Sequence, residues 1–256
     1  MSDDQRIQKI AEIIKEHNPD LACLQEVSDL NDAFTLYKEL SPEFADVYFH
    51  MGATPFILQN NSGLFVASKL PISSPELQSF SDLEGTELMV NKCYFLFSTD
   101  LAHFINTHLS PSSDDLDPTE AEINRRAQEQ KKILASVDQR WSEEHKPVFV
   151  VGDFNINWGR QEHKEGVLFS RSTDSYNEDR GVGGDEKTTC ETDYLVRRNW
   201  QHEKNAPLQQ LILDYFLSFF QSNRTVVNTR KIPTFDVNHP EQAISDHAGL
   251  FSKVLV

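Results

Sequence analysis

Apolar residues recur along this chain with two different periods, and each period predicts one kind of secondary structure. Isoleucines spaced by three and four residues predict an amphipathic helix over residues 3–17, which Asn18 and Pro19 end. The apolar run at 21–24 is typical of a strand that is buried on both faces. A second helix is predicted over 30–40. Further strands are expected at 46–51, 63–68, 93–98, 102–107, 148–151, 212–218, 224–229 and 249–255.

The longest helix is predicted over residues 118–141, where an apolar stripe repeats at spacings of three, four or seven residues. Asp117 is expected to cap its N-terminus. Pro118 fits the first helical position, because the N–H group that proline lacks would have no partner in the helix there. Glu120 is expected to complete a capping box. A helix of this length with one apolar face is expected to pack on the core.

The order of helices and strands indicates the fold class. No linker divides residues 1–256, so a single domain is expected. A doubly wound parallel sheet would need more helices between the strands that lie from 46 to 107, so the order favours an α/β sandwich of two or four layers. Periodicity fades over 156–208, and this stretch is interpreted as a poorly patterned insertion, either a functional lid or disordered decoration.

Composition narrows the class of protein. The net charge is −16, which disfavours non-specific binding along nucleic acid but is compatible with a site that concentrates divalent cations. No apolar run approaches the roughly 20 residues that span a bilayer, and no signal peptide is visible, so a soluble protein is expected. The three cysteines are far apart and match neither a zinc site nor a disulfide framework. Cys23 and Cys93 are interpreted as small buried apolar residues.

Ionisable residues stand where several apolar strands end. Taken singly, each has an ordinary explanation, because a strand-end carboxylate is usually solvated and Asp-x-Asn commonly makes a turn. Asp214 is harder to explain, since it lies within an apolar run and a buried carboxylate needs a partner. His247 is the predicted partner, because a carboxylate on one ring nitrogen fixes the tautomer of the other. The candidate residues are Glu26, His108, Asp153, Asn155, Asp214, Asp246 and His247.

Together these residue types supply what metal-assisted hydrolysis of a phosphoester requires. Glu26 offers the hard carboxylate oxygen that Mg²⁺ prefers. A water can be positioned and deprotonated by Asp153, Asp246 and His247, and phosphoryl oxygens can accept hydrogen bonds from His108 and Asn155. No Ser or Cys lies in a nucleophile elbow, which argues against a covalent route. No Gly-x-x-x-x-Gly-Lys loop occurs, which argues against P-loop nucleotide hydrolases.

The candidate residues lie in five short motifs that follow one another along the chain. The motifs are Leu24-Gln25-Glu26, Thr107-His108-Leu109, Gly152-Asp153-Phe154-Asn155, Leu213-Asp214-Tyr215 and Ser245-Asp246-His247. In this order they resemble the motifs of the endonuclease/exonuclease/phosphatase superfamily, which includes deoxyribonuclease-I-like nucleases, inositol-polyphosphate phosphatases and neutral sphingomyelinases. The resemblance runs from about residue 8 to the C-terminus, and it implies a four-layer α/β/β/α sandwich, with the site at one edge of its two facing sheets.

The resemblance also implies a cofactor, a substrate class and a role for each residue. Mg²⁺, with Mn²⁺ as its alternative, would bind Glu26, and Asp246 would support the metal or the water. The substrate would be a phosphodiester, either a lipid headgroup or a nucleic acid, and the protein is expected to be a monomer. The implied catalytic residues are His108 and Asn155 at the scissile phosphate, Asp153 and His247 at the water, and Asp214 as the partner of His247.

Individual residues bear on the branch of the superfamily. Asn91-Lys92, followed by the predicted strand at 93–98, is similar to an Asn-Lys-Gly element of the neutral sphingomyelinase branch, although Cys93 replaces its Gly. Arg126 and Gln130 on the long helix, and Thr189-Cys190 ahead of Asn199, favour the same branch. The superfamily normally opens with a strand that delivers an Asn to the metal and phosphate. Here the helix follows Met1 directly, so we expect a fragment or a wrong start, a segment that takes the place of the strand, or an impaired site.

Two alternatives to a phosphodiesterase follow from the same residues. One is an inositol-phosphate or other phosphomonoesterase of the superfamily, and the other is a catalytically impaired binding module. A lipid substrate calls for exposed aromatic side chains, and a phosphoinositide calls for a basic pocket. The candidates for these surfaces are Trp158 and Trp200 for lipid, and Arg171, Arg180, Arg197 and Arg198 for a phosphoinositide.

Overall fold

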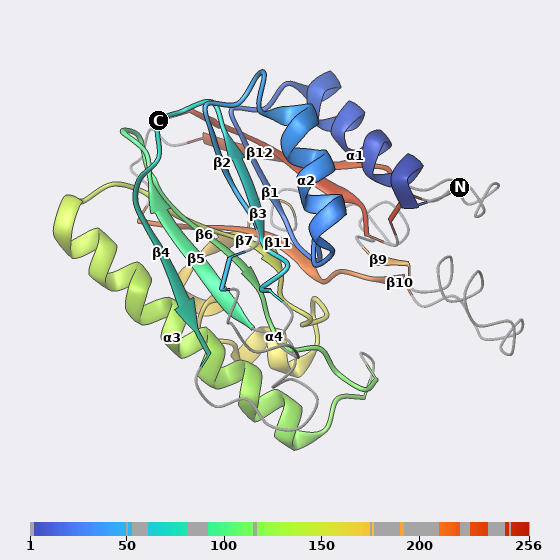
Figure 1. Cartoon of the computed structure of the whole chain (residues 1–256). Helices are drawn as coiled ribbons and strands as arrows, with labels where there is room; N and C mark the ends of the chain where they lie inside the picture. The colour runs from blue at the N-terminus through green and yellow to red at the C-terminus, as the bar shows by residue number, and fades with distance from the viewer. Residues whose placement is uncertain are drawn as a thin grey trace, which may run out of the picture.

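Two packed sheets, each covered by helices, make up the computed structural model (Figure 1). The structure describes residues 3–49, 51–52, 61–80, 92–114, 117–174, 176, 190–191, 210–220, 226–234, 244–245 and 247–255. The helices are α1 (Asp3–His17), α2 (Leu30–Leu40), α3 (Glu120–Glu144) and α4 (Gln161–Glu165), with a 3-10 turn, η2 (Phe169–Arg171). The strands are β1 (Leu21–Leu24), β2 (Asp46–Tyr48), β3 (Phe65–Ser68), β4 (Ser73–Ser79), β5 (Cys93–Ser98), β6 (His103–His108), β7 (Val148–Asp153), β8 (Thr173–Asp174), β9 (Cys190–Glu191), β10 (Gln210–Leu211), β11 (Asp214–Phe219), β12 (Val226–Ile232) and β13 (Gly249–Leu255).

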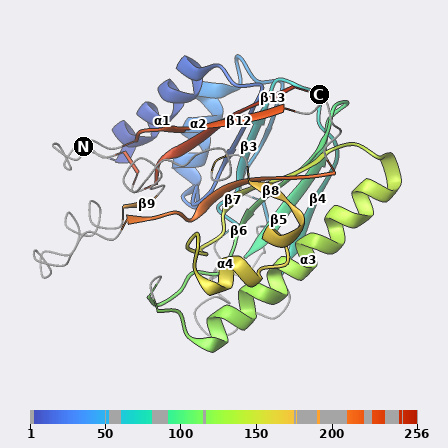
Figure 2. The same cartoon turned by 180° about the vertical axis from the view of Figure 1, so that it is seen from behind.

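The layers follow the order helix, sheet, sheet, helix. The first sheet has the strand order β1-β3-β2, and the antiparallel pair β12-β13 lies in the same layer (Figures 1 and 2). The second sheet has the order β4-β5-β6-β7-β11-β8. Helices α1 and α2 cover the first sheet, and α3 runs along the outer face of the second. The predicted four-layer α/β/β/α sandwich is therefore confirmed.

Three apolar clusters fill the spaces between these four layers. In β3, Phe65 and Ala67 pack toward α1 and α2, whereas Val66 packs between the two sheets. In β5, Phe95 packs between the sheets, whereas Leu96 packs toward α3. Alternate side chains of a strand point to opposite faces, so these two strands are buried on both. This double burial explains why their sequences read as continuous apolar runs.

The cysteines of the two sheets behave as apolar residues. Cys93 lies in the cluster between the sheets, and Cys23 packs against it. Burial disfavours the charged thiolate, and it raises the pKa of both thiols to about 12. Cys93 is buried as expected, whereas Cys23 is partly buried.

The predicted start of α3 is wrong by two residues. Thr119, rather than Asp117, is the N-cap, and its side chain accepts a hydrogen bond from the backbone N–H of Glu122. The Glu122 carboxylate accepts the backbone N–H of Thr119 at 2.7 Å, so Glu122 replaces the expected Glu120 in the capping box. Thr119 to Glu122 is a Thr-x-x-Glu sequence, in which both side chains reach the other residue's backbone.

Several other boundaries differ from the prediction. Strand β4 is absent from the prediction because its sequence is polar, as suits an exposed edge strand. The strand predicted at 212–218 begins at Asp214, and the strand predicted at 148–151 continues to Asp153. The stretch 156–208 contains regular structure in its described part, including α4, η2 and β8. No helix among the described residues has the length and apolar character needed to cross a membrane.

Candidate active site

The ends of three neighbouring strands bring ionisable side chains to one edge of the second sheet. Strands β6 and β7 are parallel, and His108 at the end of β6 lies opposite Asp153 at the end of β7. Strand β11 is antiparallel to β7 and begins with Asp214, which also lies opposite Asp153. Residues separated by up to 106 positions therefore share a single edge because of strand register alone.

Gly152 allows the approach of β7 to β6 just before this edge. Its φ is 139°, and a Cβ atom there would lie 1.9 Å from the carbonyl oxygen of Thr107. A larger residue would therefore displace one strand from the other. The approach leaves His108 Nε2 at 3.6 Å from Asp153 Oδ2.

Glu26 reaches the same edge from the first sheet. It follows β1 in a left-handed conformation, with φ 61°, and the next residue, Val27, donates its N–H to the carbonyl of Gly63 at 2.9 Å. Gln25 Nε2 donates to Asn106 Oδ1 at 2.7 Å, which ties this turn to β6 of the other sheet. The Glu26 side chain is 74% exposed, and its Oε1 lies 4.0 Å from His108 Nε2.

Asn155 is held by a local turn and by a contact with the neighbouring loop. Its backbone N–H donates to Asp153 Oδ1 at 2.8 Å, and its φ of 51° is one that asparagine tolerates. Its side-chain Nδ2 donates to the carbonyl of Leu109 at 2.9 Å. The turn explanation for Asp-x-Asn is thus correct, and it places the Asn155 amide beside the other candidates.

Asp214 and His247 form a hydrogen-bonded pair. Asp214 Oδ2 accepts from His247 Nδ1 at 2.8 Å, and His247 Nε2 lies 3.9 Å from Asp153 Oδ2. Ser245 Oγ accepts the backbone N–H of His247, and Thr234 Oγ1 donates to its carbonyl. Because a carboxylate only accepts, Nδ1 is assigned the hydrogen, and Nε2 is the basic nitrogen that faces Asp153.

Burial governs the protonation of the site. It raises the pKa of Asp153 to about 7, the nearby Asp214 adds to the rise, and the His247 charge opposes it. Burial also holds the pKa of His108 well below its usual value, with Lys92 and His247 contributing in the same direction. His108 is therefore neutral at pH 7. Since both neighbours of its Nε2 are carboxylates, Nε2 is assigned the hydrogen and acts as a donor.

Lys92 is a charged component of the site that the sequence analysis did not place there. Its Nζ donates to the carbonyl of Leu109 at 3.0 Å, and the residue is buried. The Leu109 carbonyl thus accepts hydrogen bonds from both Lys92 Nζ and Asn155 Nδ2. The sequence signal for Lys92 is its similarity to the neutral sphingomyelinase branch, and that similarity does not identify the partner.

The donor set fits a magnesium ion with few protein ligands. Of the candidates, Asp246 lies outside the described residues, and Glu26 alone presents a carboxylate that is largely exposed at this edge. Within the described ranges, no group of three His, Cys, Asp or Glu side chains is arranged to hold a metal. Mg²⁺ is commonly held by one or two carboxylates together with water and substrate phosphate, so a single carboxylate suits it better than zinc.

Comparisons with known proteins bear on the family and the fold of this chain. Residues 1–247 match the model of the Endonuclease/Exonuclease/phosphatase family. A comparison with curated protein sequences finds no match.

Solved structures that resemble this chain at low sequence identity include the following three proteins. The first is a beta toxin variant from Staphylococcus aureus with bound magnesium ions (19% identity, TM-score 0.72, covering 98% of this chain and 91% of that chain). Another is sphingomyelinase C from Streptomyces griseocarneus (18%, TM-score 0.70, 98% and 88%). The third is truncated TDP2 from Caenorhabditis elegans (17%, TM-score 0.71, 99% and 91%). At these identities the likeness shows the fold.

Proposed function

Because this chain belongs to the endonuclease/exonuclease/phosphatase family, we propose that it is a magnesium-dependent phosphodiesterase with its active site at the shared edge of β6, β7 and β11. The observation that carries the proposal is the Asp214–His247 hydrogen bond of 2.8 Å, which aims His247 Nε2 at the Asp153 carboxylate. An ordinary surface ion pair would not need to hold the second ring nitrogen of the histidine toward another carboxylate, whereas a general base does need such an orientation.

In the proposed reaction, Asp153 and His247 orient the attacking water. The water's oxygen forms a bond to phosphorus as its proton passes to His247 Nε2, and the Asp214 carboxylate stabilises the resulting imidazolium. The phosphorus–oxygen bond to the leaving alcohol then breaks, and the alcohol takes up a proton from solvent. Asp214 thus contributes through His247 without a change in its own protonation.

Two neutral donors bind the phosphoryl oxygens in this proposal. His108 Nε2 and the second N–H of the Asn155 amide can both donate to an oxygen that gains negative charge, because the first amide N–H is engaged by Leu109. Glu26 would hold the magnesium ion, and when bound this ion supplies positive charge near the phosphate. Asp246 belongs to the proposed metal or water ligands as well, although it lies outside the described residues.

The charge of the whole chain favours a substrate with a single phosphate over a polyanion. A net charge of −16 repels a nucleic acid over long distances, whereas a phosphocholine diester is electrically neutral overall. Trp158, which is 41% exposed, comes three residues after Asn155 and is a candidate contact for such a headgroup. Of the arginines expected in the basic pocket of a phosphomonoesterase, Arg171 is held in a bidentate ion pair with Asp138 on α3. The others, Arg180, Arg197 and Arg198, lie outside the described residues, as does Trp200.

The decisive experiment measures hydrolysis of p-nitrophenylphosphocholine, bis-p-nitrophenyl phosphate and p-nitrophenyl phosphate, with Mg²⁺ and with EDTA. We expect metal-dependent turnover of the two diesters, a preference for the choline ester, and loss of turnover in His247→Ala. Hydrolysis of the monoester alone would support a phosphatase. A folded protein without turnover of any ester would contradict the enzymatic proposal and support the binding module.

A further inference from the structure

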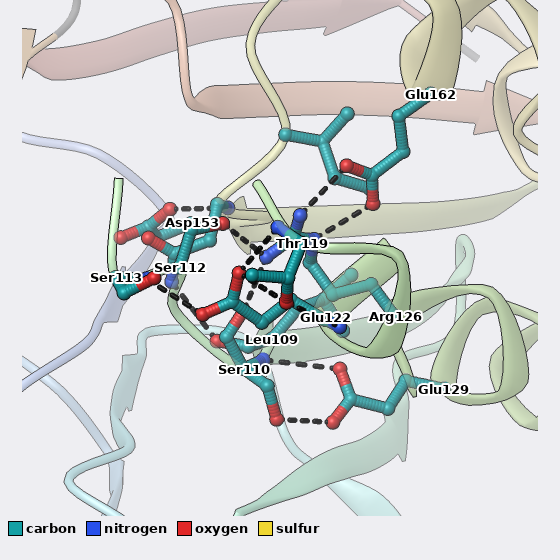
Figure 3. A network of polar contacts seen from close by, with 12 residues as sticks. Leu109, Ser110, Ser112, Ser113, Thr119, Glu122, Arg126, Glu129, Asp153 and Glu162 are labelled. Carbon is teal, nitrogen blue, oxygen red and sulfur yellow. Dashed lines mark hydrogen bonds and ion pairs between the residues drawn. The ribbon is translucent and has the colours of Figure 1, made fainter. Parts of the chain in front are cut away.

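Helix α3 presents charged side chains to the loop of residues 109–113, which follows β6. Glu122, Arg126 and Glu129 recur at spacings of four and three residues, so they lie on one face of α3 (Figure 3). Arg126 is fully buried, and Glu129 is 3% exposed. Long charged side chains are rarely buried so completely unless every polar atom has a partner, so this cluster requires an explanation.

Arg126 joins three separate segments of the chain. Its Nε and Nη2 donate to both carboxylate oxygens of Glu162, on α4, at 2.7 Å each. Its Nη1 donates to Ser112 Oγ at 2.6 Å and to the carbonyl of Ser110 at 3.2 Å. One guanidinium therefore fixes the loop relative to α4, and the planar fork of arginine is the group suited to this geometry.

The two acidic residues hold the same loop at two further points. Glu129 accepts the backbone N–H of Ser110 at 3.0 Å and its hydroxyl at 2.5 Å. Glu122 accepts the backbone N–H of Ser113 at 2.8 Å. Hydrogen bonds from α3 thus reach both ends of the loop, as the close view shows (Figure 3).

The inner side of the loop contacts the candidate active site. The Leu109 backbone N–H donates to the carbonyl of Asp153 at 3.0 Å, and its carbonyl accepts Asn155 Nδ2 and Lys92 Nζ. His108 directly precedes this loop. Movement of residues 109–113 would therefore displace the two proposed phosphate donors together.

Stability alone does not account for this arrangement. A buried ion pair contributes little more than apolar side chains of the same size would, because both charges lose their hydration. Arg140 provides a comparison on the same helix. It is nearly buried, but its ion-pair partners Glu76 and Glu143 are both about half exposed. It also donates to the carbonyl of Ser74 in the edge strand β4.

We propose that Arg126 and Glu129 are positioning residues, which hold the 109–113 loop and thereby keep the Asn155 amide and His108 in place for the reaction. This inference rests on the proposed phosphodiesterase function. It predicts a loss of turnover rather than of substrate binding, because the groups that contact the substrate stay present and only their placement changes.

The experiment compares Arg126→Gln and Glu129→Gln with the matched control Arg140→Gln. With bis-p-nitrophenyl phosphate and Mg²⁺, we expect kcat to fall about 100-fold in Arg126→Gln and about 10-fold in Glu129→Gln, with KM changed less than about threefold. Arg140→Gln is expected to keep the wild-type kcat although it loses its ion pairs with Glu76 and Glu143. A wild-type kcat in Arg126→Gln, or an equal loss in Arg140→Gln, would overturn the inference.

Hydrogen exchange of backbone amides separates this inference from the proposed function. We expect Ser110 and its neighbours to exchange at least about tenfold faster in Arg126→Gln and to be unchanged in Arg140→Gln. If Arg126→Gln fails to fold, Ser112→Ala and Glu129→Gln remove loop contacts while the Arg126–Glu162 pair stays intact. If the wild-type protein hydrolyses no ester, the proposed function fails, and unchanged loop exchange in these variants would also reject the positioning role.

Discussion

The Asp214 carboxylate faces His247 Nδ1 at the start of β11, so the proposed role of Asp214 can be tested by a single substitution. Asp214→Asn preserves the shape but replaces an acceptor with an amide that can favour the wrong imidazole tautomer. We expect kcat to fall about 10³-fold while KM changes little. The assay should use bis-p-nitrophenyl phosphate, with circular dichroism to verify the fold.

The matched control for this substitution is Asp138→Asn. Asp138 also accepts hydrogen bonds from a basic side chain, but its partner, Arg171, lies on the surface of the helical layer. Exposed pairs contribute about 0 to 1 kcal/mol, so kcat should not change. Equal activity of Asp214→Asn and Asp138→Asn would show that the Asp214–His247 contact has no catalytic role.

His163 makes the stability of the protein depend on pH. Its ring packs 4.4 Å from the ring of Phe169, and its Nδ1 has no hydrogen-bond partner among the described residues. Burial lowers its pKa from 6.5 to about 4. Between these two pH values the unfolded state binds the proton more readily than the folded state. The contribution of neutral His163 to the stability of the fold is therefore complete above pH 6.5 and is lost as the pH falls toward 4.

The full shift would correspond to about 3 kcal/mol of unfolding free energy, and since the ring is only half-buried we expect about 1 to 2 kcal/mol. Urea denaturation at pH 7 and pH 4.5 should show this loss in the wild-type protein. His163→Phe, which cannot be protonated, should lose less stability over the same range. The exposed His145, replaced by Asn, serves as the control and should leave the pH dependence unchanged.

At the scale of secondary structure, α3 begins with a capping box whose strength can be measured. The backbone N–H groups of Ser113 and Thr119 hold the pKa of Glu122 down to about 2, so its carboxylate remains charged at ordinary pH. Thr119→Ala removes the hydroxyl that caps the helix and should reduce the unfolding free energy by about 1 kcal/mol. Asp117→Ala should change the unfolding free energy by less than about 0.5 kcal/mol. A larger loss in Asp117→Ala than in Thr119→Ala would instead identify Asp117 as the N-cap.

The sequence allows prediction of those elements whose local pattern reflects their environment. Strands β3 and β5 are apolar up to their final serine because both faces are buried, and α1 has a regular apolar stripe. Strand β4 was not predictable by this criterion, since an exposed edge strand needs no apolar face. The buried face of α3 includes Arg126 and Glu129, whose partners follow from tertiary contacts that no periodicity encodes.

The same reasoning applies to the candidate site. Polar residues that end apolar strands could be found from the sequence, and the register of β6, β7 and β11 brings His108, Asp153 and Asp214 together. Their roles stay predictions. The sequence indicated Lys92 only through the similarity to one branch, because its bond to the backbone carbonyl of Leu109 does not depend on the side chain at position 109.

For the whole molecule, a net charge of −16 predicts an unusual response to salt. Raising the ionic strength from about 0.02 to 0.2 M screens long-range repulsion, so kcat/KM on single-stranded DNA should rise several-fold. The kcat/KM for p-nitrophenylphosphocholine should stay nearly constant as salt is added, because that substrate is neutral overall. A fall of the DNA rate with salt, as for proteins that bind phosphates through basic residues, would contradict this expectation.

The parallel pairing of β6 and β7 has a consequence for how the protein folds. Residues 109–147, including the whole of α3, form the connection between these two strands, so the pairing closes a long loop. Closing such loops is slow compared with forming a helix. His247 must then join from the far end of the chain. During refolding, helical structure should therefore return early. Catalytic activity should return last, because it requires every one of these strand pairings to have formed.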